Sequence, residues 1–165
     1  MSESPLTNAS PKSDASIAFR SLFVATIYED EAAADRARRL MSRILQMAGH
    51  AEPVQEYTCG LQFLDHPDGP AATARRAGSV DVLVVAMHSD SPALGRVADW
   101  LTYWLAPQRR KPGALVSMTI EQPEASAAPS SNEKRLSSIA AQIDMNFFST
   151  RLPAAVEFID DTSSA

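Results

Sequence analysis

The chain has 165 residues, of which 45% are hydrophobic and 21% charged, and its formal net charge is −5. This composition is typical of one globular domain with a core of its own. The negative charge argues against a nucleic-acid partner, because binding to phosphates needs clustered cations. No apolar run approaches the roughly 18 residues of a membrane span, and the single cysteine, Cys59, excludes an intramolecular disulfide. We therefore predict a cytoplasmic domain that binds neither nucleic acid nor a membrane.

The two ends of the chain differ in composition from its middle. Residues 1–16 are rich in Ser, Pro and Asn and carry too little apolar surface to offset the entropy of ordering. We expect a disordered N-terminal tail there, a single domain over residues 17–160, and a short C-terminal tail over residues 161–165.

The first half of the domain alternates strand and helix patterns. Ser21–Ile27 is apolar and rich in β-formers without strict alternation, which is typical of a strand covered on both faces. Helical spacing runs over Glu31–Ala48 and ends at Gly49, a residue suited to a left-handed cap. A second strand region, Val54–Leu64, is interrupted near Gly60.

The alternation continues through the third strand. Pro70 suits the first turn of a short helix over Ala71–Ala77, and Val82–Met87 is an apolar strand. Capping and proline signals near Ser91 and Pro92 open a helix over residues 91–109. At about 100° per residue one apolar stripe of this helix faces the sheet. Its members are Leu94, Val97, Ala98, Leu101 and Leu105.

The last elements follow the same order. Ala114–Ile120 is a fourth strand, and the capping-box pattern Ser130-x-x-Glu133 opens another helix. Asn146–Thr150 is a candidate fifth strand. Parallel strands need crossovers of a dozen or more residues, usually helical, so this alternation predicts an α/β, three-layer sandwich. Among the few allowed topologies we predict a five-stranded parallel sheet of order 2-1-3-4-5, the flavodoxin-like arrangement.

Ligands of such sheets bind beyond the carboxyl ends of the strands, where the strand order reverses. Here that switch point lies between strands 1 and 3, and strand 4 completes its rim. Strand 1 is followed by the carboxylates of Glu29–Glu31. The candidate cofactor contacts on the other two strands are Ser89, Asp90, Ser117 and Thr119.

Two stretches, Ser91–Leu101 and Lys111–Ser117, carry a family resemblance. They are similar to a small-Pro-x-x-Leu-Lys-x-x-x-Asp-Trp helix and the following Lys-Pro turn of flavodoxin-like, NADPH-dependent FMN reductases. With the preceding strand and the loops, the resemblance runs over Asp81–Thr119, about a quarter of the chain, and implies the fold and an FMN site. However, that family holds the flavin phosphate on a Gly/Ser/Thr-rich loop after strand 1, where this chain has Tyr28-Glu29-Asp30-Glu31. Three carboxylates there would repel a phosphate dianion.

The same acidic turn resembles that of bacterial receiver domains, which bind Mg²⁺ there and phosphorylate an aspartate at the end of strand 3. Glu29 and Asp30 match the acidic pair, and Ser117 or Thr119 matches the hydroxyl after strand 4. The position of the phosphorylated aspartate falls on Ala86. The lysine that receiver domains have after strand 5 also has no counterpart, because no lysine follows Lys134. The overall pattern is also similar to that of single-domain bacterial proteins.

The acidic turn has two further interpretations. Carboxylates in the first helical turn interact favourably with the helix dipole. Alternatively, Glu29 and Asp30, with Asp90, bind a hard cation such as Mg²⁺. Neither the histidines nor Cys59 has metal-ligand or triad spacing, and Cys59 is expected to be a buried apolar residue.

Three aromatic residues on the helix over residues 91–109 are candidate interface residues. Trp104 flanks the apolar stripe and is expected to be buried, whereas Trp100 and Tyr103 project away from it. Exposed aromatic side chains are enriched at interfaces, so we predict a protein partner or a homodimer at this helix.

The leading hypothesis is a regulatory or protein-interaction module without catalysis of its own and without a cofactor. An FMN-binding oxidoreductase of flavodoxin type and a pseudo-receiver in two-component signalling are the alternatives, and the question of an enzyme stays open.

Overall fold

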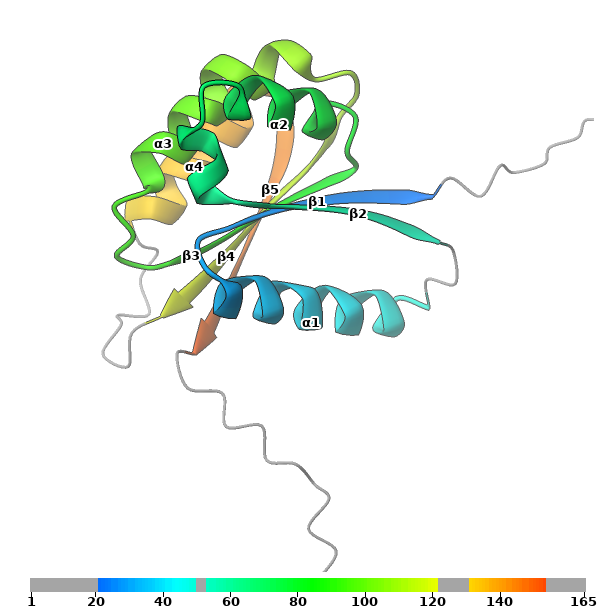
Figure 1. Cartoon of the computed structure of the whole chain (residues 1–165). Coiled ribbons are helices and arrows are strands. Elements are labelled where there is room, and N and C mark those ends of the chain that lie inside the picture. The colour runs from blue at the N-terminus through cyan, green and yellow to red at the C-terminus, as the bar shows by residue number, and fades with distance from the viewer. Residues whose placement is uncertain (1–20, 50–52, 122–130, 154–165) are drawn as a thin grey trace, which may run out of the picture.

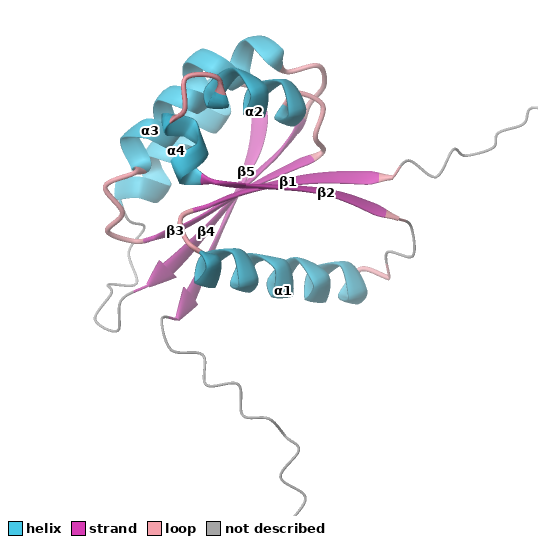
Figure 2. Cartoon of the chain, in the orientation of Figure 1, coloured by secondary structure: helices cyan, strands magenta, loops and turns pink. Residues whose placement is uncertain are grey.

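The computed structural model describes residues 21–49, 53–121 and 131–153. They form three layers, with a parallel five-stranded sheet between two layers of helices (Figures 1 and 2). The strands are β1 (Leu22–Tyr28), β2 (Val54–Gly60), β3 (Val82–His88), β4 (Gly113–Glu121) and β5 (Met145–Pro153). The helices are α1 (Glu31–Met47), α2 (Gly69–Ala77), α3 (Leu94–Asp99) and α4 (Ser131–Gln142). The predicted tails, residues 1–16 and 161–165, and Ser130 of the capping box lie outside the described residues.

The strand order is β2-β1-β3-β4-β5, and every neighbouring pair is parallel. Both features confirm the predicted flavodoxin-like arrangement. The sheet order reverses between β1 and β3, so the carboxyl ends of these two strands form the switch point. No helix among the described residues is long and apolar enough to cross a membrane.

The two faces of the sheet are covered unequally. Among the described helices α1 lies alone on one face, and α2, α3 and α4 cover the other (Figure 1). The core under α1 joins Ala33 and Ala37 to strand residues such as Val84 and Met118. The larger core beneath the other three helices includes the fully buried side chains of Leu83, Val85, Leu101, Leu105 and Leu115.

Helix α1 ends as predicted, with Gly49 in the left-handed region at φ +64°. The predicted second strand is too long at its end, because β2 stops at Gly60 and Leu61–Asp65 form a 3₁₀ helix. This short helix brings the carbonyl of Phe63 against the start of α2, where a Cβ on Gly69 would lie 1.7 Å from that oxygen. Only glycine allows this approach. Helix α2 thus begins two residues earlier than predicted.

Helix α3 is irregular where the sequence predicts one continuous helix. It begins at Leu94 and continues through the π-helical segment Trp100–Leu105 into a 3₁₀ turn, Ala106–Gln108. The N–H of Ala106 donates to the carbonyl of Leu101, five residues earlier. The predicted apolar stripe is nevertheless buried at all five of its positions.

Candidate functional site

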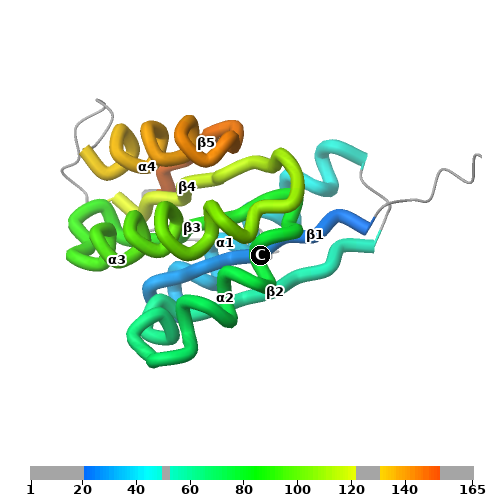
Figure 3. Tube along the Cα trace, turned by 90° about the horizontal axis from the view of Figure 1, so that it is seen from above, coloured from blue at the N-terminus to red at the C-terminus, as the bar shows by residue number. Residues whose placement is uncertain are grey.

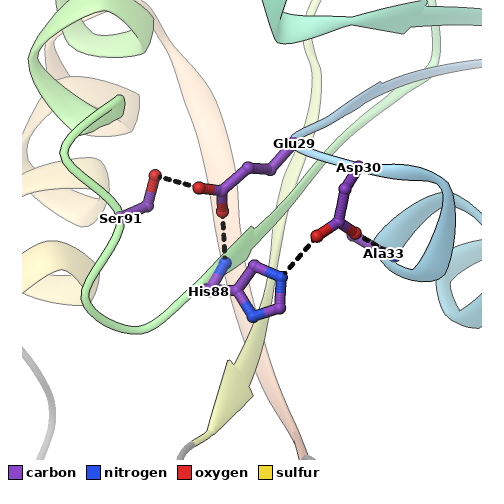
Figure 4. A network of polar contacts seen from close by, with 5 residues as sticks. All are labelled: Glu29, Asp30, Ala33, His88 and Ser91. Carbon is purple, nitrogen blue, oxygen red and sulfur yellow. Dashed lines mark hydrogen bonds and ion pairs between the residues drawn. The ribbon is translucent and has the colours of Figure 1, made fainter.

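The switch point lies where β1 and β3 end side by side. The chain leaves β1 with the N–H of Glu29 still donating to the carbonyl of Ala86 in β3, at 3.0 Å. The next residue, Asp30, begins α1, and His88 ends β3. Figure 4 shows that side chains of these two strand ends meet across the switch point.

The carboxylate of Glu29 joins β1 to the loop after β3. One of its oxygens accepts a hydrogen bond from the backbone N–H of His88 at 2.8 Å. The other accepts a hydrogen bond from the hydroxyl of Ser91, also at 2.8 Å. That hydroxyl in turn accepts from the N–H of Ala93, at 3.1 Å, just before α3. The side chain of Glu29 therefore occupies the hydrogen-bond donors at the position where this fold binds its ligands.

Asp30 occupies the N-terminus of α1. Its Oδ1 accepts a hydrogen bond from the N–H of Ala33 at 2.8 Å, and its backbone is extended, as an N-cap requires. Its Oδ2 lies 2.7 Å from Nε2 of His88 (Figure 4). The hydrogen bond from Ala33 has the largest effect and lowers the pKa of Asp30; burial opposes it, and the hydrogen bond to the His88 ring lowers the pKa further. The helix N-terminus, a natural anion site, is thus filled by the side chain of the chain's own cap.

The two predicted cation ligands point to different partners. Glu29 reaches toward α3, whereas Asp30 turns toward α1 and the ring of His88 (Figure 4). Among the described residues, no three His, Cys, Asp or Glu side chains gather as a metal-binding set. A Mg²⁺ site on Glu29 and Asp30 stays a prediction, and it would have to replace hydrogen bonds that these carboxylates already accept.

The structure separates the four candidate cofactor contacts into two groups. Ser89 and Asp90 lie in the loop after β3, where the N–H of Ser89 donates to Ile120 at 3.0 Å and Asp90 is exposed. The carbonyl of Ser89 accepts from the side-chain amide of Asn132 in α4, at 2.9 Å. Ser117 and Thr119 are buried in β4. The rim of the switch point is therefore formed by the loop after β3 and not by the hydroxyls of β4.

The burial of the aromatic residues reverses two of the three predicted orientations. Trp100 is only 2% exposed, and its indole N–H donates to the carbonyl of Pro70 at the start of α2, at 3.1 Å. Trp104 is 44% exposed and Tyr103 is 71% exposed. The prediction from spacing at about 100° per residue took the sheet as the helix's packing partner. In the structure α2 also covers the side of the helix that carries Trp100. The wider π-helical turn carries Trp104 away from the apolar stripe.

Sequence reasoning missed a cation at the carboxyl end of β5. Arg151 contacts Glu121 of β4 at 3.1 Å and donates to both oxygens of Glu133 in α4, at 2.9 and 3.3 Å. The hydrogen bond to Glu133 raises the pKa of Arg151. No lysine follows Lys134 in the sequence, but an arginine within a β-rich segment was a usable signal for a cation there. Arg151 links the ends of β4, β5 and α4.

The expected burial of Cys59 is confirmed, since it is 6% exposed and its thiol lies near the hydroxyl of Thr73 at 3.8 Å.

No protein-family model and no curated protein matches this chain. A function for this chain must therefore be inferred from its sheet order, its strand register and the contacts at the switch point.

Proposed function

We propose that this chain is a non-catalytic, flavodoxin-like regulatory module that acts through protein–protein contact. The observation that carries the proposal is the carboxylate of Glu29, which accepts hydrogen bonds from the His88 N–H and the Ser91 hydroxyl. In this fold, donors of this kind at the switch point are the groups that would hold an anionic ligand. A ligand phosphate there would have to displace Glu29 and approach the carboxylate of Asp30.

The contact surface in this proposal is the exposed aromatic pair Tyr103 and Trp104, which follows α3. Their exposed fractions, 71% and 44%, are large for aromatic side chains. Aromatic residues are enriched at interfaces because they bury a large area with few rotatable bonds. The buried Trp100, whose indole N–H donates to the carbonyl of Pro70, is not part of this surface. We place the module in the cytoplasm, because its one cysteine, Cys59, has no disulfide partner in the chain.

A flavin titration tests the non-catalytic part of the proposal. FMN is added to the purified protein at micromolar concentrations, and flavin fluorescence and the melting temperature are recorded. We expect neither to change. Saturable quenching of the flavin, or a yellow protein on purification, would instead support the alternative function of an FMN-binding oxidoreductase.

Site-specific photo-crosslinking tests the contact surface. The variant Tyr103→p-benzoylphenylalanine is irradiated in cells, and Phe63→p-benzoylphenylalanine serves as the matched control. Phe63 is also an exposed aromatic, 41% accessible, but lies in the 3₁₀ helix after β2. We expect a defined protein adduct from position 103 that is absent from position 63 and is lost when Trp104→Ser is added. Equal adducts from both positions would contradict the assignment of the surface.

A further inference from the structure

The strand β5 forms one edge of the sheet. It pairs with β4 along its whole length, from Gly113 opposite Met145 to Glu121 opposite Pro153, without a bulge. Within the described ranges, no strand pairs with its other edge. Figure 3 shows β5 and α4 at one side of the molecule and β2 at the opposite side. The outward backbone N–H and C=O groups of an edge strand can pair with another strand.

The side chains of β5 give this edge little protection. Edge strands usually carry exposed charges, prolines within the strand or bulges that prevent pairing. The nine residues of β5 include one charged side chain, Arg151, and it is turned into ion pairs with Glu121 and Glu133. Phe148 is 57% exposed and extends from the face of the sheet that α1 covers elsewhere. Apart from Pro153 at its end, β5 therefore has no exposed charge or proline to prevent pairing, its exposed side chains being Asn146, Phe148 and Ser149, and its outer edge is unpaired in the described residues.

The opposite edge strand is different. β2 carries Glu56, and its Tyr57 ring lies beneath the guanidinium of Arg76, 5.0 Å from the ring centroid. Charges of this kind disfavour the addition of a strand. The two edges of the sheet are thus unequal, and β5 is the one suited to pairing.

A hollow of about 470 Å³ adjoins β5 on the side of α4. Small and polar side chains predominate in its lining, so it has room for the side chains of an added strand. The lining consists of Glu133, Lys134, Ser137, Ser138, Phe147 and Ser149.

We propose that β5 pairs antiparallel with β5 of a second copy of this chain, so that two sheets join into one across a two-fold axis. Full overlap of the nine-residue strands places Ser149 of each copy opposite its counterpart. Phe148 then lies diagonally across from Phe148 of the second copy, within reach for aromatic contact. On the other face Phe147 lies opposite Arg151 of the second copy, whose guanidinium keeps its ion pairs with Glu121 and Glu133.

Helix α4 argues for a second copy as the occupant. The ion pair of Glu133 with Arg151 fixes α4 beside β5. Four residues further along α4, about 6 Å, corresponds to about two residues along the strand, which places Ser137 level with Ser149. The two-fold axis through Ser149 therefore brings the small side chains near Ser137 of both helices together.

The charges along α4 are complementary under the same two-fold axis. Lys134 and Arg135 lie in its first half, and Asp144 follows its end, where the free carbonyl groups carry partial negative charge. Two antiparallel α4 helices place the basic half of each beside the acidic end of the other. An unrelated peptide would share the strand pairing but not this complementarity.

Light scattering on the full-length protein over a range of concentrations tests the proposal. We expect a reversible dimer, and Phe148→Lys is expected to raise its Kd by about a hundredfold or more, because each dimer loses two buried phenyl groups. Phe63→Lys replaces another exposed aromatic and should leave the Kd unchanged. Circular dichroism of both variants establishes that they are folded.

A cysteine at the two-fold axis gives a second measurement. Ser149→Cys in a Cys59→Ala background is expected to form an intermolecular disulfide on mild oxidation, because directly opposed residues of antiparallel strands lie within disulfide range. Gln55→Cys on the β2 edge is the control and should remain reduced.

A monomer at all concentrations would overturn the proposal, as would a dimer that survives Phe148→Lys and forms no Ser149→Cys disulfide. Dimerisation that occurs only after removal of residues 154–165 would also overturn it, because that segment would then be the occupant of the edge. A dimer lost on Tyr103→Ser but retained in Phe148→Lys would place the interface on the proposed contact surface instead. Flavin binding would refute the proposed function but leave the β5 dimer intact.

Discussion

Asp30 offers the most direct test of the switch-point geometry, because its two carboxylate oxygens have separate partners. Oδ1 caps α1 through the N–H of Ala33, and Oδ2 contacts the ring of His88. Loss of an N-cap acceptor costs about 1 kcal/mol, and the exposed hydrogen bond to the ring of His88 adds about 0.5 kcal/mol. We therefore expect Asp30→Ala to lower the free energy of unfolding by about 1.5 kcal/mol at pH 7. Asp30→Asn keeps a capping oxygen and should lose only about 0.5 kcal/mol.

The pH dependence separates the charge of Asp30 from its capping role. The hydrogen bond from Ala33, followed by the interaction with His88, holds the pKa of Asp30 below its ordinary value of 3.8. The folded state thus binds this proton less tightly than the unfolded state does. The resulting stabilisation is present above about pH 4 and is lost as the pH falls through the folded-state pKa. The difference between the wild type and Asp30→Asn should therefore shrink below pH 4.

Urea unfolding at several pH values, followed by tryptophan fluorescence from the buried Trp100 and the partly exposed Trp104, measures these differences. Asp68→Ala is the matched control: Asp68 precedes α2, but its side chain makes no capping hydrogen bond. We expect the free energy of unfolding of this control to stay within about 0.5 kcal/mol of the wild type. Equal stability of Asp30→Ala and the wild type at pH 7 would refute the cap, and a constant gap between the wild type and Asp30→Asn down to pH 3 would refute the charge argument.

Two further substitutions test contacts that hold neighbouring elements of the fold together. Glu29→Ala removes the acceptor for the His88 N–H and the Ser91 hydroxyl, so thermal and urea unfolding should show a loss of about 2 kcal/mol, with Glu29→Gln intermediate. A Glu29→Ala protein as stable as the wild type would contradict these contacts. Gly69→Ala places a methyl group against the carbonyl of Phe63 and should cost about 3 kcal/mol in the same assay. A neutral Gly69→Ala would show that the 3₁₀ helix can move away at little cost.

The sequence was sufficient to predict the sheet, because the alternation of strands and helices leaves few topologies. The apolar stripe from Leu94 to Leu105 and the cap at Gly49 are local patterns, and both are present in the structure. The orientation of the tryptophans depends on nonlocal packing. Trp100 is buried because α2 lies beside it, and Trp104 is exposed after a π-helical turn that hydrophobic spacing does not reveal.

The candidate site was only partly predictable for the same reason. The acidic turn after β1 is visible in the sequence, but its partners are distant. His88 is 58 residues from Asp30, and Ser91 is 62 residues from Glu29. The switch-point rule places these segments at one edge of the sheet. The rule does not predict that a carboxylate after β1 accepts hydrogen bonds from groups after β3, because such contacts depend on the length and direction of the side chains.

The contacts at the switch point join the loop after β3 to β1 and to α4. The loop after β3 is held by Glu29 from β1 through Ser91, and by Asn132 from α4 through the carbonyl of Ser89. The same loop leads directly into α3, whose continuation carries Tyr103. If the proposed contact surface is correct, a partner bound there would contact an element whose base is held to β1 and α4 by hydrogen bonds. At the position where this fold binds its ligands, this chain has a carboxylate that connects the end of β1 to the end of β3 and to the start of the loop into α3, and this contact is the one on which the proposed non-catalytic function rests.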